Sequence, residues 1–175
     1  NAESIIARVR QDTHWVPSEH RLRSDFPLLG GDKVGPLWLR MLRDNGQLEF
    51  QALENLWIPG DVHILRASFC TRAISGTYEG RSPEVFDQVR HLWKVATAGL
   101  EIENHGALIA LDVDEPLWAL SRYCCSRQGR GRLQCPGEGC PLRAPVVTGT
   151  LRLTEDKYSI DTAKIPSRST LPERG

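Results

Sequence analysis

The chain has 175 residues and a formal net charge of zero, because 22 basic side chains balance 22 acidic ones. Its 40% hydrophobic and 25% charged residues are ordinary for a globular protein with its own hydrophobic core. The balanced charge gives no basis for a general affinity for nucleic acid or membrane surfaces. The longest apolar run, residues 107–111, is also too short to cross a bilayer. We expect one domain over residues 1–162 and an extended tail over 163–175.

The first sixty residues are predicted to be mainly helical. Residues 2–12 place hydrophobic side chains on one face of a helix. Residues 13–36 contain several prolines and glycines, which predict an irregular segment. Pro36 favours the start of a second helix that ends at residues 45–46. Residues 47–57 then predict a third helix, which forms a helical hairpin with the second.

The middle of the chain changes to a mixed pattern. Residues 62–78 are rich in β-branched and aromatic side chains and predict the first strand region. Ser82 followed by proline and glutamate is typical of a helix start, and this helix is expected to end at Gly99. Residues 100–113 predict a β-hairpin. Its acidic residues are expected to lie on a solvated face, with a divalent-metal site at Glu101, Glu103 and His105 as the less favoured alternative.

The last third of the chain predicts a helix, a loop and two strands. A helix begins at residues 114–116 and continues to Cys124, after which a cysteine-rich loop extends to Cys140. Residues 146–153 and 158–160 predict a pair of strands. The mixed order of helices and strands indicates an α+β fold with a small, mainly antiparallel sheet.

Four of the five cysteines lie in that loop, and they are Cys124, Cys125, Cys135 and Cys140. Thiolates that converge on one point bind zinc or an iron–sulfur cluster. Glycines between Cys135 and Cys140 permit the tight turn that such convergence needs. The loop therefore predicts a metal site with these four cysteines as ligands and zinc or a [2Fe–2S] cluster as the cofactor.

The pattern of the loop resembles the iron–sulfur motif of siderophore ferric-iron reductases. The resemblance rests on the adjacent pair Cys124-Cys125, followed by Cys135 and by Cys140-Pro141-Leu142. It implies that these four cysteines hold a [2Fe–2S] cluster and that the protein is an iron–sulfur redox protein. The chain departs from the family in having four residues between its last two cysteines, where the family has two, and in having residues 141–175 after the motif.

Two alternatives to a metal site remain open from the sequence. Cys124 and Cys125 are also suited to a buried helix face, because a free cysteine packs as a small apolar residue. Cys135 and Cys140 are also suited to a surface pair that oxidises in air. Cys70 stands apart and is expected in the core, with a role as a completing thiolate as the alternative. The odd total of five cysteines, four of which are bunched, and the lack of a visible apolar leader favour a reduced, cytoplasmic protein.

Arginines surround the cysteine loop, and three of them, Arg127, Arg130 and Arg132, lie within it. Such a surface can bind phosphate groups or a partner. The sequence thus predicts a metal site that orders an arginine-rich binding surface, with no membrane partner. An iron–sulfur redox protein and a cofactor-free module that binds nucleic acid or protein are the alternatives. No residue pattern identifies a catalytic group, so the sequence does not decide whether the protein is an enzyme.

Overall fold

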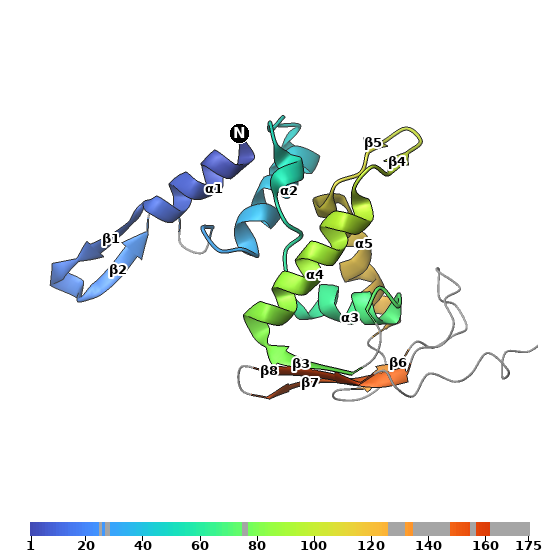
Figure 1. The fold of residues 1–175 in the computed structure, drawn as a ribbon. Coiled ribbons are helices and arrows are strands. Elements are labelled where there is room, and N and C mark those ends of the chain that lie inside the picture. The colour runs from blue at the N-terminus through green and yellow to red at the C-terminus, as the bar shows by residue number, and fades with distance from the viewer. Residues whose placement is uncertain are drawn as a thin grey trace, which may run out of the picture. The chain divides into compact units, whose positions relative to one another are not determined.

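The computed structural model describes residues 1–24, 26, 29–74, 77–125, 132–134, 148–154 and 157–161. Within these residues the fold is α+β, as the sequence predicts (Figure 1). The α-helices are α1 (Ala2–Gln11), α2 (Val34–Gly46), α3 (Val62–Cys70), α4 (Ser82–Thr97) and α5 (Asp114–Ala119). The strands are β1 (Thr13–Val16), β2 (Arg21–Ser24), β3 (Thr77–Arg81), β4 (Glu101–Ile102), β5 (Gly106–Ala107), β6 (Arg132–Gln134), β7 (Thr148–Thr154) and β8 (Lys157–Asp161).

The chain divides into two compact units, each made of two segments. The first unit comprises Asn1–Gly60 and Arg90–Asp114, and the second comprises Asp61–Val89 and Glu115–Gly175. Helix α4 contributes its first half to the second unit and its second half to the first. The predicted tail, residues 163–175, lies outside the described residues. No helix in the described part of the chain is long and apolar enough to cross a membrane.

The core of the first unit is built by α1, α2 and two 3₁₀ turns, at Leu53–Asn55 and Ala110–Val113. Helix α1 begins where the Asn1 side chain accepts a hydrogen bond from the Ser4 amide at 2.9 Å, as an N-cap residue does. These elements bury the apolar side chains of Ala2, Ile6, Leu39, Leu53, Leu56 and Leu111. Gly35 allows α2 to approach α1 closely, because a Cβ atom there would lie 2.6 Å from Ile6 Cδ1.

Two predictions for the first unit are wrong. Residues 13–24, expected to be irregular, form the antiparallel hairpin β1–β2. Its connection turns at His20, whose φ is 51° and whose amide donates to the Pro17 carbonyl. Residues 47–57, expected to be helical, contain only the 3₁₀ turn Leu53–Asn55, so there is no helical hairpin. Left-handed backbone at Gln47 and Ala52, with φ of 53° and 59°, interrupts the predicted helix at two positions.

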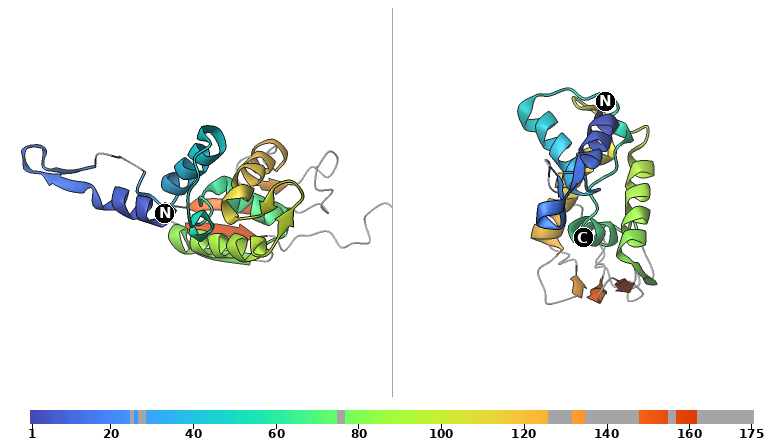
Figure 2. Two further views of the ribbon diagram at one scale, coloured as in Figure 1. Left: turned by 90° about the horizontal axis from the view of Figure 1, so that it is seen from above. Right: turned by 90° about the vertical axis from the view of Figure 1, so that its left-hand side faces the viewer.

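The second unit contains a four-stranded antiparallel sheet with the strand order β3-β8-β7-β6. Strands β7 and β8 form the hairpin that the sequence predicts, in the register Leu151 opposite Ile160. Strand β6 lies within the cysteine-rich loop and pairs with β7, which the sequence analysis did not anticipate. Figures 1 and 2 show α3 lying against one face of this sheet.

Helix α3 occupies the segment that was predicted to begin the first strand region, so that part of the prediction is wrong. The Asp61 carboxylate accepts hydrogen bonds from the amides of His63 at 2.8 Å and Ile64 at 3.0 Å. This N-cap begins the helix, and burial of the apolar face outweighs the strand preference of the β-branched residues. Of the described residues in the predicted region, Thr77 and Tyr78 at its end belong to a strand, β3.

The segment from α4 to Cys125 largely follows the predictions. Helix α4 begins at Ser82 and ends before Gly99, whose φ is 74°. The hairpin β4–β5 turns at Asn104, but residues 110–113 form a 3₁₀ turn instead of the predicted return strand. Helix α5 continues into a π-helical turn, Leu120–Cys124, where the Cys125 amide donates to the Leu120 carbonyl at 3.0 Å.

Candidate functional site

One face of α3 meets the π-helical turn within the second unit. His63, Arg66 and Cys70 are spaced by three and four residues, which places them on the same face of α3. His63 Nδ1 lies 3.2 Å from Ser121 Oγ, and Arg66 Nη1 donates to the same oxygen at 3.3 Å. One turn farther along both elements, Cys70 meets Cys125. We call His63, Arg66, Cys70, Ser121 and Cys125 the α3–π cluster.

Ser121 joins the polar part of this cluster. Its side chain is completely buried, and buried hydroxyl groups need hydrogen-bond partners. A guanidinium group only donates, so Ser121 Oγ accepts from Arg66 and can donate its own proton to His63 Nδ1. Ser121 therefore positions the other two side chains and is not exposed to act as a nucleophile.

Cys70 and Cys125 form the thiol part of the cluster. Their residues are only 3% and 1% exposed. The Cys70 thiol donates a hydrogen bond to the Cys125 sulfur, and this lowers the pKa of Cys125 below its ordinary value. Burial acts in the opposite direction, and the nearby positive charge of Arg66 lowers the pKa further. The Cys125 thiol therefore loses its proton more readily than an ordinary cysteine does, and the thiolate is the form that binds metals.

The structure places only part of the predicted ligand set. Cys125 is buried in the cluster, and its neighbour Cys124 is half-buried and not disulfide-bonded. Cys135 and Cys140 lie outside the described residues. Among the residues that the structure describes, no group of three or more His, Cys, Asp and Glu side chains is arranged to hold a metal. The predicted four-cysteine site therefore stays a prediction.

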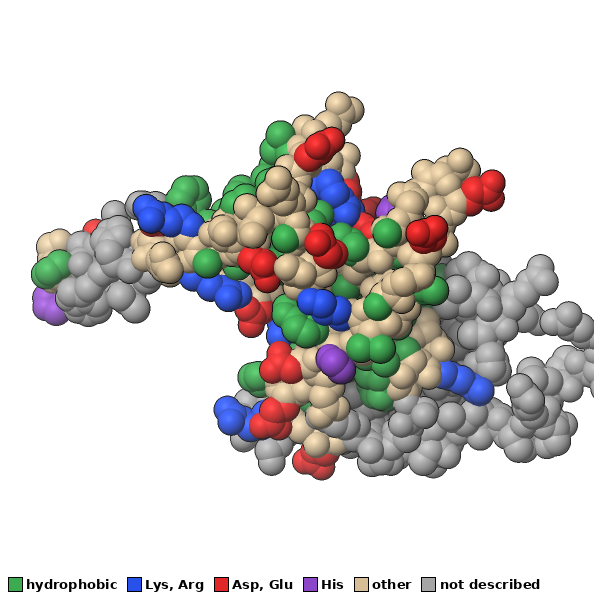
Figure 3. Space-filling model, turned by 45° about the horizontal axis from the view of Figure 1, so that its top comes forward, with side chains coloured by type: hydrophobic (Ala, Val, Ile, Leu, Met, Phe, Trp, Pro, Cys, Tyr) green, Lys and Arg blue, Asp and Glu red, His purple; other side chains and the backbone are tan. Residues whose placement is uncertain are grey.

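Of the three arginines predicted to form a binding surface, only Arg132 lies among the residues that the structure describes. Arg127 and Arg130 lie outside the described residues. Arg132 begins β6, where its backbone is opposite Thr150 of β7. On the face that Figure 3 shows, the basic and acidic side chains of the described residues are interspersed, in keeping with the zero net charge.

Two aromatic side chains adjoin the cluster. The Trp118 ring lies 5.6 Å from the His63 ring, measured between centroids, and 6.1 Å from the Tyr123 ring, which it meets edge-on. Trp118 is 38% exposed and Tyr123 is 60% exposed. Tyr123 directly precedes the cysteine-rich loop, and Trp118 lies in α5. Partly exposed aromatic rings are suited to contacts with a ligand or partner.

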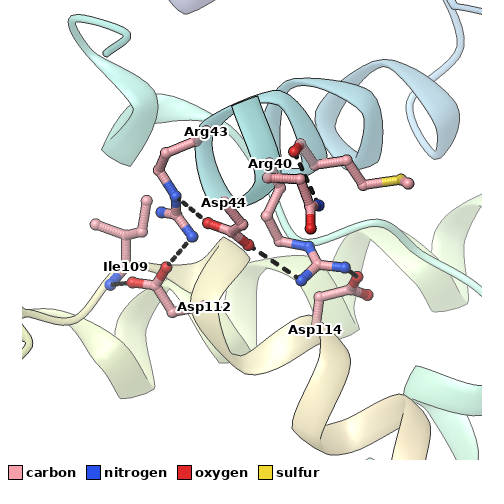
Figure 4. Close-up of polar contacts among 8 residues, drawn as sticks. Arg40, Arg43, Asp44, Ile109, Asp112 and Asp114 are labelled. Atoms are coloured by element: carbon pink, nitrogen blue, oxygen red, sulfur yellow. Dashed lines mark hydrogen bonds and ion pairs between the residues drawn. The ribbon is translucent and has the colours of Figure 1, made fainter. Parts of the chain in front are cut away.

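The acidic segment has a structural role. Glu101, Glu103 and His105 are exposed around the hairpin β4–β5, which confirms the solvated-face prediction. Asp112 and Asp114 instead bind α2, as Figure 4 shows.

Arg43 Nη2 lies 2.7 Å from Asp112 Oδ1, and Arg40 Nη2 lies 3.4 Å from Asp114 Oδ2, so both contacts are ion pairs. Burial opposes the charge of Arg43, but hydrogen bonds to Asp44 and Asp112 outweigh it and raise the pKa of Arg43. These ion pairs fasten the 3₁₀ turn Ala110–Val113 to α2 within the first unit.

Sequence reasoning missed most of the α3–π cluster. It selected Cys125 but left Cys70 as a core residue and assigned no role to His63, Arg66 or Ser121. The missing signal was Asp61, an N-cap that turns residues 62–70 into a helix and so aligns His63, Arg66 and Cys70.

Comparisons with protein-family models, with curated proteins and with solved structures gave no match for this chain. The assignment of a function therefore rests on the chemistry of the residues themselves.

Proposed function

We propose that this protein holds zinc or a [2Fe–2S] cluster through the thiolates of Cys124, Cys125, Cys135 and Cys140, and that the bound metal orders the arginine-rich loop. The observation that supports the proposal best is the setting of Cys125. Its buried sulfur accepts a hydrogen bond from Cys70 and lies near the Arg66 guanidinium. Hydrogen bonds and positive charge around a sulfur stabilise the anionic form that a metal requires.

The donor set fits soft, thiophilic metals. Thiolates bind zinc and iron–sulfur clusters, whereas carboxylates and carbonyls suit magnesium and calcium. Cys70 would then serve as the hydrogen-bond donor that supports Cys125, and not as a ligand itself. Zinc would supply folding energy to the loop, and a cluster would add the capacity to carry one electron.

The metal proposal is tested by comparing cysteine variants for metal content. Cys125→Ser and Cys135→Ser should each lose most of the bound metal, because each removes a ligand. Cys70→Ser is the matched control in the same cluster: it should retain the metal and bind it with about 10-fold lower affinity, because it alters only the hydrogen bond to the ligand sulfur. Equal metal content in all three variants, with native circular dichroism, would refute the ligand assignment.

A second candidate function is binding of nucleic acid, and it is favoured by the two aromatic rings. Tyr123 is exposed immediately before the loop that carries Arg127 and Arg130, and Trp118 is exposed in α5. Single strands bind where cationic side chains contact phosphates and aromatic rings stack on bases. We infer that a single-stranded oligonucleotide is the macromolecular ligand to try first.

Binding of that oligonucleotide should weaken steeply as salt is raised, because phosphate contacts release counterions. Tyr123→Ala should weaken it more than Tyr123→Phe, which keeps the ring. Failure of an oligonucleotide to bind at low salt would remove this candidate and leave a protein as the partner of the loop.

A further inference from the structure

A continuous line of side-chain contacts in the second unit leads from an exposed aromatic ring to a half-buried arginine. Tyr123 meets Trp118 edge-on, and Trp118 lies against the His63 ring. His63 Nδ1 lies 3.2 Å from Ser121 Oγ, and Arg66 Nη1 donates to the same oxygen at 3.3 Å. The His63 and Arg66 side chains are therefore only two hydrogen-bond lengths apart. All five residues belong to the second unit, so the whole line is built within one compact part of the chain.

Arg66 differs from the other half-buried arginines that the structure describes. Those arginines each lie within ion-pair distance of an aspartate, and they are Arg40, Arg43 and Arg90. Among the described residues, the Arg66 side chain has a hydrogen bond to Ser121 Oγ but no ion pair with a carboxylate. A half-buried cation is costly to leave without an anion. The guanidinium group keeps donors and charge for one, and its planar fork suits phosphate.

The aromatic end of the line adds a second requirement for the ligand. Tyr123 is 60% exposed, so the contact with Trp118 positions its ring without covering it. Exposed aromatic rings of this kind stack on nucleic-acid bases. A ligand with both an anionic group and a flat aromatic group would engage both ends of the line. An inorganic anion would engage Arg66 alone.

We propose that the line from Tyr123 to Arg66 binds one nucleotide unit, with a phosphate on Arg66 and the base stacked on Tyr123. The proposal rests on the second candidate function for the class of its ligand. It goes beyond that function in assigning a phosphate contact to α3, outside the arginine-rich loop. Ser121 is a positioning residue in this site, because its buried hydroxyl holds Arg66 and does not reach the ligand.

Small probes test the site in the wild-type protein. The probes are inorganic phosphate, thymidine and thymidine 5′-monophosphate, and binding is followed through the indole N–H resonance that Trp118→Phe removes. We expect the monophosphate to bind about 10-fold more tightly than thymidine, because it adds a charged hydrogen bond. It should also bind more tightly than inorganic phosphate, which has no base to stack. Absence of monophosphate binding, or affinity equal to that of either smaller probe, would overturn the proposal without any variant.

Two arginine variants then locate the phosphate. Arg66→Gln removes the proposed contact. Arg72→Gln is the matched control, because it removes the same charge from an exposed side chain just beyond the end of α3. Arg66→Gln should abolish the advantage of the monophosphate over thymidine, and Arg72→Gln should keep it. Circular dichroism shows whether both variants are folded, and equal effects of two folded variants would overturn the assignment to Arg66.

A short oligothymidylate separates failure of the site from failure of the second candidate function. The slope of log binding constant against log salt should become shallower by about 0.7 in Arg66→Gln and stay unchanged in Arg72→Gln, as loss of one phosphate contact to a single strand requires. An oligonucleotide that binds with the same slope in Arg66→Gln and the wild type would overturn the site and leave the oligonucleotide function standing. Monophosphate binding that depends on Arg66, without oligonucleotide binding, would refute that function and support the site.

Discussion

Replacement of Asp61 with alanine should destabilise α3 and the cluster that it carries. Asp61 accepts hydrogen bonds from the amides of His63 and Ile64, which have no acceptor inside the helix. Loss of an N-cap side chain costs about 0.5–2 kcal/mol of stability. Because two part-buried amides lose their acceptor in a helix of only 9 residues, we expect about 1.5 kcal/mol. The thermal midpoint should fall by about 3–6 °C.

Urea denaturation followed by circular dichroism measures this change, and Asp61→Asn is the matched control. Asparagine keeps a side-chain acceptor and is as good an N-cap residue as aspartate, so its cost should stay within about 0.5 kcal/mol. Cys70, in the last turn of the same helix, should also react faster with a thiol reagent in Asp61→Ala than in Asp61→Asn. Equal stability of Asp61→Ala and the wild type, or an equal cost for both variants, would refute the role of the N-cap.

Three further predictions follow from single contacts. Gly35→Ala should cost about 1–3 kcal/mol of unfolding free energy, because the added methyl group overlaps the Leu29 carbonyl oxygen, which is backbone, as well as Ile6 Cδ1. Gly46→Ala, at the end of the same helix, has room and should be neutral or stabilising in the same urea titration. Arg43→Gln should lower the free energy of unfolding by about 2 kcal/mol, because it leaves the buried Asp112 carboxylate without its cation. Arg8→Gln removes an exposed ion pair and should change that free energy by less than about 1 kcal/mol. Equal effects of the two variants would contradict the argument from burial. The pKa of Cys125 is lowered in the folded state, so in metal-free protein its stabilising contribution is present above the unfolded pKa and is lost as pH falls through the folded pKa. Cys70→Ala should therefore move the midpoint of the thiolate absorbance of Cys125 to higher pH. An unchanged midpoint would show that Cys70 does not donate to Cys125.

Local signals predicted the elements whose ends carry strong markers. The Ser-Pro-Glu start at Ser82 and the turn at Asn104 are both found where the sequence placed them. The errors arose where tertiary packing decided the outcome. Residues 62–70 have strand-forming side chains, but the Asp61 cap and burial against the sheet make them a helix. The predicted helix at residues 47–57 fails because Gln47 and Ala52, neither of them glycine, adopt left-handed backbone that no propensity indicates.

The sequence singled out only those residues of the site that are close to one another along the chain. Adjacent cysteines and arginines are visible in a sequence, so Cys124 and Cys125 were selected from the start. The partners of Cys125 come from α3, more than fifty residues earlier, and a contact of that range leaves no periodic signal along the chain. Ser121 was missed for the same reason, since its importance lies in the two side chains that it joins.

The most direct test of the proposed function is to purify the protein without air, measure its metal content and record an absorption spectrum of the same sample. The account predicts either about one zinc per chain and no colour or about two irons per chain with visible charge-transfer absorption. The metal should be lost in Cys125→Ser and retained in Cys70→Ser. A wild-type protein that is folded and carries neither zinc nor iron would contradict the proposal of a thiolate metal site.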